Sequence, residues 1–417
     1  MVHQRHAAIS NFNRSLRAVI GLVCTMILAT TILAHSQTFS VLHYFTGASD
    51  GGNPTSGVTV AAPGTLYGTA AIPGAAFRLT ERASGWTLDP LHDFTGGSNG
   101  DTPYSGLVIG PNGALYGTTN AGGFGVGIVY ELRPPATACN TAICNWNETV
   151  IHAFTGNIGD GGFPGYGNVT FDQAGNMYGT TSLNGTADCG VVWKLAPSSG
   201  GWTESVLYDF AGGTNGCNPE SGVVFDAAGN LYGTTACDFL CQGTGTVFQL
   251  VPSNGGWTEN PLMVLNATTG THPWGTLIAD QSGNFYGTAT EEGPNGGGTV
   301  FELSPSDGGW TFSLVYSFSS CNPTAGVTLG ADGNLYGACE GGGANADGWL
   351  FEMPRNCNQT CAPADLHDFS GTDGAGPIGP VVFDASGNLY GTTFEGGIGN
   401  CNGGSGGCGV VWEITPN

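Results

Sequence analysis

The sequence predicts an all-β protein in which seven copies of one four-stranded antiparallel unit close into a β-propeller. Three observations predict this fold: a tetrapeptide written seven times, a shared order of strand and turn residues around each copy, and complementary partial units at the two ends. A repeat of about 50 residues is typical of propeller blades, since a single small sheet buries its faces only by stacking on its neighbours.

The tetrapeptide consists of an apolar residue followed by Tyr-Gly-Thr, and successive tyrosines are 49 to 62 residues apart. The seven copies begin at Leu66, Leu115, Met177, Leu231, Phe285, Leu335 and Leu389. Only the sixth copy changes the final residue, to Ala338. The recurrence indicates one supersecondary unit copied seven times.

The copy at residues 222–266 illustrates the elements of a unit. Short runs rich in β-formers occupy residues 222–226, 231–235, 245–250 and 257–265, and Gly, Asn and Pro separate them. This pattern predicts an antiparallel meander and not a βαβ unit, because no stretch has a helical period. A β-helix is the alternative, but it uses shorter coils without hairpins.

The two ends of the chain predict how the ring closes. The seventh copy stops after its third strand at Ile414, while Leu42-His43-Tyr44-Phe45 matches the fourth-strand segment Leu91-His92-Asp93-Phe94. We therefore expect the first strand to complete the last blade, which removes two exposed sheet edges.

Residues 1–36 have the features of a signal peptide, which leaves 37–417 as a single propeller domain. Arg5, Arg14 and Arg17 precede an apolar stretch at 18–33, and Ala34-His35-Ser36 supplies small residues for cleavage. A membrane anchor is the alternative, although the stretch is shorter than the roughly 20 residues a spanning helix needs. We expect an exported protein, extracellular or periplasmic, with no membrane attachment after cleavage.

Charge and cysteine content agree with export. The formal net charge of −23 argues against nucleic acid or an anionic membrane surface as a partner, and we expect a monomer. Thirteen cysteines are present, one of them (Cys24) within residues 1–36, and an exported chain is expected to pair the other twelve. The disulfide candidates are Cys139, Cys144, Cys189, Cys217, Cys237, Cys241, Cys321, Cys339, Cys357, Cys361, Cys401 and Cys408. Sequence does not fix the pairing, but Cys189–Cys217 and Cys321–Cys339 bridges would join neighbouring loops.

Across residues 39–417 the repeat reads G-N-L-Y-G-T-T, then G-x-V-F-x-L, G-G-W-T and L-x-x-F-x-G. This repeat resembles the choice-of-anchor tandem repeat family with GloVer-type repeats. The resemblance implies a secreted propeller-like protein and names no reaction. That family carries varied C-terminal surface anchors, whereas this chain ends at Asn417 shortly after a strand, which leaves surface attachment open. The D-x-x-G-N-L-Y hairpin is also similar to gluconolactonase-type and NHL-type propellers.

The loops after the second and fourth strands should share one face, and rigid loops on one face suit binding. We expect a non-enzymatic module that binds a glycan or a protein there, through His272, Trp274, Glu220, Glu340 and Glu395. The alternative is a glycan-acting hydrolase or lyase, which would need two carboxylates close together at the channel mouth. Asp188, Asp238, Glu291 and Glu292 are further acidic candidates. A purely structural envelope component is a third possibility.

Other polar residues are interpreted as structural. The Asx-Gly pairs at Asp50, Asn99, Asp160, Asn215 and Asp373 predict tight turns, with calcium ligation as the alternative, so no cofactor is expected. The carboxylates of Asp172, Asp226, Asp280 and Asp384 should bond the amides of their own turns.

Four histidines share one position of the repeat with Tyr208, Tyr316 and Val264, which favours packing over metal ligation; they are His43, His92, His152 and His367. Two G-x-S-x-G matches, at Ser98 and Ser405, lack the strand-to-helix context of a nucleophile.

Overall fold

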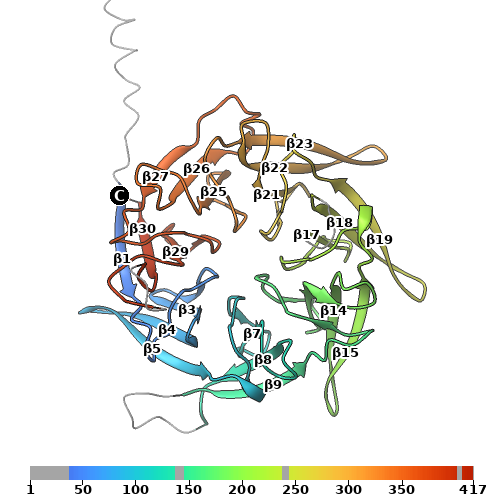
Figure 1. Ribbon diagram of the computed structural model, residues 1–417, viewed down its shortest axis with the longest axis horizontal. Coiled ribbons are helices and arrows are strands. Elements are labelled where there is room, and N and C mark those ends of the chain that lie inside the picture. Colours follow the sequence, from blue (N-terminus) through green and yellow to red (C-terminus); the bar gives the residue numbers. More distant parts are fainter. Residues whose placement is uncertain (1–36, 137–144, 237–243, 402–405, 417) are drawn as a thin grey trace, which may run out of the picture. The chain divides into compact units, whose positions relative to one another are not determined.

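The computed structural model describes residues 37–136, 145–236, 244–401 and 406–416, and Phe39–Thr415 form one compact unit. In this unit seven four-stranded antiparallel sheets follow one another around an axis (Figure 1). The predicted seven-bladed β-propeller is therefore confirmed. The predicted signal peptide 1–36 and Cys139, Cys144, Cys237, Asp238, Cys241 and Ser405 lie outside the described residues.

The blades, numbered 1 to 7 in chain order, each use four strands. The first three blades contain β2 (Thr59–Ala62), β3 (Thr65–Ala71), β4 (Gly74–Arg82) and β5 (Gly85–Phe94); β6 (Val108–Ile109), β7 (Leu115–Thr119), β8 (Ile128–Arg133) and β9 (Asn147–Ala153); and β11 (Thr170–Phe171), β12 (Met177–Thr181), β14 (Val191–Ser198) and β15 (Gly201–Asp209). A small extra ladder pairs β10 (Gly161–Gly162) with β13 (Leu183–Asn184).

The remaining blades repeat the arrangement. They contain β16 (Val224–Phe225), β17 (Leu231–Thr235), β18 (Thr246–Ser253) and β19 (Gly256–Val264); β20 (Ile278–Ala279), β21 (Phe285–Glu291), β22 (Gly297–Ser306) and β23 (Gly309–Ser317); β24 (Val327–Leu329), β25 (Asn334–Cys339), β26 (Trp349–Pro354) and β27 (Ala364–Asp368); and β28 (Val382–Phe383), β29 (Leu389–Thr393), β30 (Val410–Thr415) and β1 (Thr38–Tyr44). Two short 3₁₀ turns, η1 (Gly97–Asn99) and η2 (Gly213–Asn215), lie in inter-blade loops. In the described part of the chain, no helix is long and apolar enough to cross a membrane.

The ring closes as the sequence predicts. β1 is the outer strand of the sheet β1-β30-β29-β28, so the beginning and the end of the propeller share blade 7. The Phe45 amide donates to the Gly409 carbonyl at 3.1 Å, and Phe39 lies 6.1 Å from Trp412 between ring centroids. Leu42 packs on the cluster that contains Phe45, which is fully buried.

The hydrophobic core lies between the blades. Each of the seven buried clusters combines residues of two neighbouring blades, including the pair formed by blades 7 and 1. A four-stranded sheet has two apolar faces, so each blade is stable only when both neighbours cover it. Closure at blade 7 therefore completes the last two of these contacts.

The repeated Tyr-Gly-Thr lies on the second strand of each blade, and the predicted turn before it is confirmed. In blade 3 the Asp172 carboxylate accepts from the amides of Ala174 and Asn176, both at 2.9 Å, and from the Tyr178 hydroxyl. The same contacts recur for Asp226, Asp280 and Asp384. These aspartates thus fix the hairpin that carries the tyrosine.

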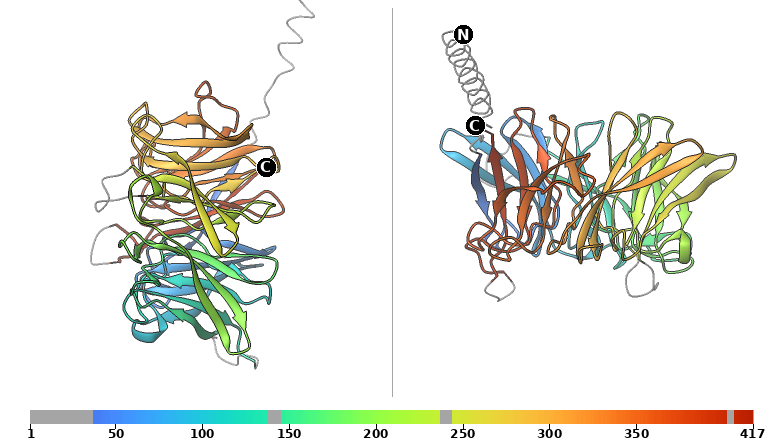
Figure 2. Two further views of the ribbon diagram at one scale, coloured as in Figure 1. Left: turned by 90° about the vertical axis from the view of Figure 1, so that its right-hand side faces the viewer. Right: turned by 90° about the horizontal axis from the view of Figure 1, so that it is seen from above.

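The strands run between two faces of the propeller, so the connections collect at those faces (Figure 2). The segment entering a blade's first strand bridges to the segment leaving its second strand, as at Asp101–Ala121 and Ala375–Glu395. The two loop types therefore share one face, as expected, and we call it the loop face. Disulfides Cys189–Cys217 and Cys321–Cys339 join loops of this face, confirming both pairings; Cys401–Cys408 and Cys357–Cys361 are also bonded.

Candidate functional site

One position on the loop face varies while its surroundings repeat. In most units the chain enters the first strand through a proline followed by a variable residue, as in Asn53-Pro54-Thr55-Ser56-Gly57. From blade 1 to blade 7 this position holds Thr55, Tyr104, Gly165 (with Tyr166 inserted after it), Glu220, Trp274, Thr324 and Ile378. Because this position varies within a repeated scaffold, the ring of side chains is a candidate recognition surface.

These positions converge on one cavity. A cavity of about 450 Å³ is lined by Thr55, Tyr104, Tyr166, Trp274, Thr324 and Ile378, together with first-strand residues such as Thr170 and Ile278. Because six of the seven blades contribute, the cavity lies at the propeller axis, where the channel opens on the loop face. We call the cavity, with Glu220 and Glu395 beside it, the channel mouth.

Three aromatic rings form a continuous stack in the channel mouth. The rings of Tyr104 and Tyr166 are 5.0 Å apart between centroids and 9° from parallel. Trp274 stacks on Tyr166 at 6.0 Å and 10°, and it keeps 37% of its surface exposed. Among the described residues Tyr166 is the only ring partner of Trp274, so the indole ends the stack.

Carboxylates gather beside the stack. Glu340 follows β25 and is the only charged side chain among the described residues that line the cavity. Partial burial and the neighbouring Glu395 raise the pKa of Glu340. Burial raises the pKa of Tyr166, and the negative charges of Glu220 and Glu340 add to this effect. Glu395 thus acts on the Glu340 carboxyl, and Glu220 and Glu340 both act on the Tyr166 hydroxyl.

The other predicted residues lie apart from the cavity. His272 is two residues from Trp274, but its Nδ1 lies 3.4 Å from Glu291 Oε2 and it does not line the cavity. Asp188 accepts from the Asn184 amide at 3.0 Å. Glu291 and Glu292 are also not lining residues in the described part of the chain.

Sequence reasoning missed Tyr104 and Tyr166. The signal that could have found them is the contrast between a variable position and its repeated neighbours Pro and Ser-Gly. A second correction concerns the shared histidine position: Val129 pairs with His152 and Val247 pairs with Met263, so the equivalent residue in blade 4 is Met263, not Val264. The strand pairs place this residue directly, and the bulge does not alter the equivalence because it occurs at the same point in the neighbouring blades.

A closed ring of seven like blades with an aromatic cavity at its axis makes the chain a repeat β-propeller. The family model described as the Gloeobacter/Verrucomicrobia repeat matches residues 143–351, about half of the sequence. The chain belongs to this repeat family, in agreement with the resemblance that its motifs indicate. A comparison with curated proteins finds no match.

Several solved structures are similar to the chain. They include a polysaccharide lyase of family PL25, an ulvan lyase bound to a sugar (10% identity, 85% of this chain and 93% of that chain, TM-score 0.47). Another is a proposed 6-phosphogluconolactonase from Bacteroides uniformis (14%, 76% and 84%, TM-score 0.47). A third, from Dyadobacter fermentans, is of unknown function (11%, 90% and 98%, TM-score 0.44). Likeness at this level carries no inference about activity.

Proposed function

We propose that this protein is an exported, non-enzymatic module that binds a carbohydrate at the channel mouth. The stack of Tyr104, Tyr166 and Trp274 is the observation that carries the proposal. Aromatic rings offer a flat apolar face to the C–H groups of a sugar, while nearby polar groups bond its hydroxyls. Trp274 has Tyr166 on one face and is more than one-third exposed, so it is the ring that contacts the ligand.

The charge of the channel mouth restricts the ligand. No Lys, Arg or His lines the cavity among the described residues, and Glu340 does. Anionic sugars such as uronates or sulfates would meet carboxylates without a compensating cation, which is unfavourable in a partly enclosed site. The ligand class is therefore neutral or amino sugars. The volume of about 450 Å³ suits one or two sugar rings, since ligand pockets typically measure about 300–1,000 Å³.

Export supports the same role. Four disulfides in the described residues are the pattern of a protein that folds in an oxidising compartment. The arginines and apolar stretch of residues 1–36 are the features of a signal peptide. An acidic exported propeller whose loops are joined by disulfides is suited to contact glycans outside the cytoplasm.

A glycan array followed by calorimetry tests the proposal. The protein should bind neutral or amino glycans, and Trp274→Ala should weaken binding at least about tenfold, the loss expected for one stacked ring. Phe124→Ala is the matched control, because Phe124 is a 74% exposed aromatic that does not line the cavity. Absence of glycan binding, or equal effects of the two variants, would refute the proposal.

Glycan cleavage is a second candidate, favoured by one observation. Burial and the neighbouring Glu395 raise the pKa of Glu340, and a carboxyl with a raised pKa near a second carboxylate is the arrangement of a general acid and its partner. A reducing-end assay on each bound glycan separates the two roles. Cleavage by the protein that Glu340→Gln abolishes, with binding retained, would replace the binding proposal with hydrolysis; a lyase would instead release unsaturated products that absorb in the ultraviolet.

A further inference from the structure

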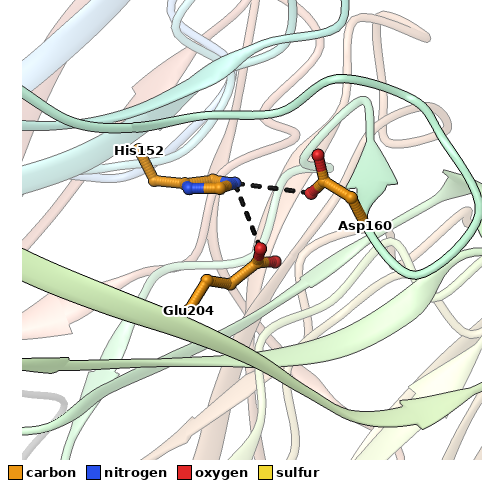
Figure 3. A group of neighbouring side chains, drawn as sticks. All are labelled: His152, Asp160 and Glu204. Atoms are coloured by element: carbon orange, nitrogen blue, oxygen red, sulfur yellow. Dashed lines mark hydrogen bonds and ion pairs between the residues drawn. The ribbon is translucent and has the colours of Figure 1, made fainter.

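Three side chains meet between blades 2 and 3, away from the channel mouth. His152 lies on β9, Asp160 directly precedes β10, and Glu204 lies on β15, and all three point toward one another (Figure 3). His152 Nε2 lies 3.3 Å from Asp160 Oδ1 and 3.6 Å from Glu204 Oε2. One ligand atom from each residue falls within 4.8 Å of the other two.

The repeat supplies its own comparison, because the same three positions recur at other blade interfaces. The histidine and aspartate are present without the glutamate in two cases, His43 with Asp50 at 3.1 Å and His367 with Asp373 at 3.0 Å. Leu88 takes the glutamate position in blade 1, and Phe39, stacked on His367 at 3.6 Å, takes it in blade 7. At each of these two interfaces the histidine therefore faces a single carboxylate, that of the aspartate.

Two more interfaces have the glutamate but not the aspartate. His92 lies 3.6 Å from Glu148, and Asn99 stands where Asp160 stands in the next loop. At the interface of blades 3 and 4, Asn215 donates its amide to Glu259 Oε2 at 2.7 Å. An amide at this position can therefore reach the glutamate and satisfy it.

Asp160 cannot do what Asn215 does. An ionised carboxylate has no proton to donate, so ionised Asp160 and Glu204 present two negative groups to one imidazole, and a proton or a cation is needed to relieve them. Asp160 is also preoriented, since its Oδ2 accepts from the Thr155 amide at 2.7 Å and its Oδ1 from the Gly161 amide at 2.9 Å. In the described residues, the interface of blades 2 and 3 is the one where all three groups coincide.

The state of Glu204 agrees with an uncompensated site. Its Oε1 is buried and has no hydrogen-bond partner. Burial raises the pKa of Glu204, His152 lowers it and Asp160 raises it, and the result is a pKa of about 7. The corresponding oxygens of Glu148 and Glu259 are also unpartnered, so the second carboxylate is what distinguishes this interface.

We propose that His152, Asp160 and Glu204 bind a divalent transition-metal ion of the Zn²⁺ class between blades 2 and 3. One imidazole and two carboxylates are ligands that Zn²⁺ accepts, and their charges balance the ion. Donor atoms about 2.1 Å from a tetrahedral Zn²⁺ lie about 3.4 Å apart. The two separations from the imidazole, 3.3 and 3.6 Å, match this value, and the third, between the two carboxylates, is no more than 4.8 Å. Water completes the coordination, and the ion links the outer strands of two blades.

Calorimetry on the EDTA-treated, dialysed protein tests the site directly, with Zn²⁺ as the probe. One equivalent should bind, and Asp160→Asn should weaken binding at least about 100-fold, since even outer-shell losses cost 10–100-fold. Asn occupies this position in two other loops, so this variant keeps the turn. Glu204→Leu, which copies blade 1, should do the same. Absence of Zn²⁺ binding, or binding that neither variant weakens, would overturn the proposal.

A gain of binding provides the converse test. Asn99→Asp places an aspartate beside His92 and Glu148 and should raise the stoichiometry from one to two. Circular dichroism and an unchanged melting profile without metal establish that each variant is folded. A stoichiometry that stays at one in the folded variant would overturn the claim that these three positions suffice as a ligand set. Glycan binding at the channel mouth is measured separately and does not enter either result.

Discussion

Gly391 lies directly across the β29–β30 pair from Trp412, and a Cβ on Gly391 would come within 2.4 Å of the indole ring. The same relationship holds in all seven blades, where the cross-strand partners of the tetrapeptide glycines are Phe77, Tyr130, Trp193, Phe248, Phe301, Phe351 and Trp412. The glycine is required because the facing aromatic ring covers its backbone.

We therefore expect Gly391→Ala to destabilise the fold by about 1–3 kcal/mol, the usual cost of overpacking a core. Gly256→Ala is the control, since a Cβ there meets nothing within 4 Å and its backbone is extended. Chemical denaturation of both variants checks the prediction. Equal stabilities would show that the indole can move aside at no cost.

Removal of the closing strand should be far more damaging. Deletion of residues 37–46 takes away β1 and exposes the edge of β30. It also removes the ring contacts that Phe39 makes with blade 6 and that Phe45 makes with blade 1. We expect a sharply lower melting temperature, and for Phe45→Ala alone a loss of about 3–5 kcal/mol, because the ring is fully buried. Ser40→Ala, at an exposed position of β1, should leave thermal melting unchanged. A truncated protein with the parental melting temperature would contradict closure.

The threonine of the repeat connects one blade to the next. Thr392 Oγ1 donates to the Ser56 carbonyl at 2.7 Å, whereas Thr288 at the same repeat position is buried without a hydrogen-bond partner in the described residues. Thr392→Val should cost about 1–2 kcal/mol, because it leaves a buried carbonyl unpaired. Thr288→Val should be neutral or stabilising, since it removes an unpaired hydroxyl. Urea unfolding of the two variants decides the matter, and equal losses would argue against this role of the threonine.

Stability should fall as pH rises through the neutral range. Burial raises the pKa of Glu148 and of Glu204 from 4.5 to about 7. Between these values the folded state holds protons that the unfolded state releases, so the free energy of unfolding decreases with increasing pH. Below about pH 4 the opposite sign applies, because hydrogen bonds from His43 and Thr46 outweigh burial and lower the pKa of Asp50.

Melting temperatures measured in EDTA at pH 5 and pH 8 check this prediction. The higher value is expected at pH 5, and Glu148→Gln should reduce the difference. Glu292→Gln, an exposed change on the loop face, should not. A melting temperature independent of pH would contradict the prediction.

Not all of the predicted binding residues belong to the cavity. Trp274 and Glu340 line the cavity, and Glu220 and Glu395 act on its groups, but His272 pairs with Glu291 outside it. Deviation from the repeat identified Trp274, because a repeated scaffold reveals any residue that departs from it. Tyr104 and Tyr166 lie in the same variable segment, but tyrosine also occurs in every copy of the tetrapeptide, so the residue type alone does not distinguish them.

By itself the sequence determined the number of blades, their strand order and the strand that closes the ring, because these follow from local periodicity and from matching segments. Only the tertiary structure decided which side chains meet. Tyr104, Tyr166 and Trp274 come from blades 2, 3 and 5, and His152 and Glu204 come from adjacent outer strands. Such distances depend on how twisted sheets pack around an axis, a long-range property that no window of residues contains.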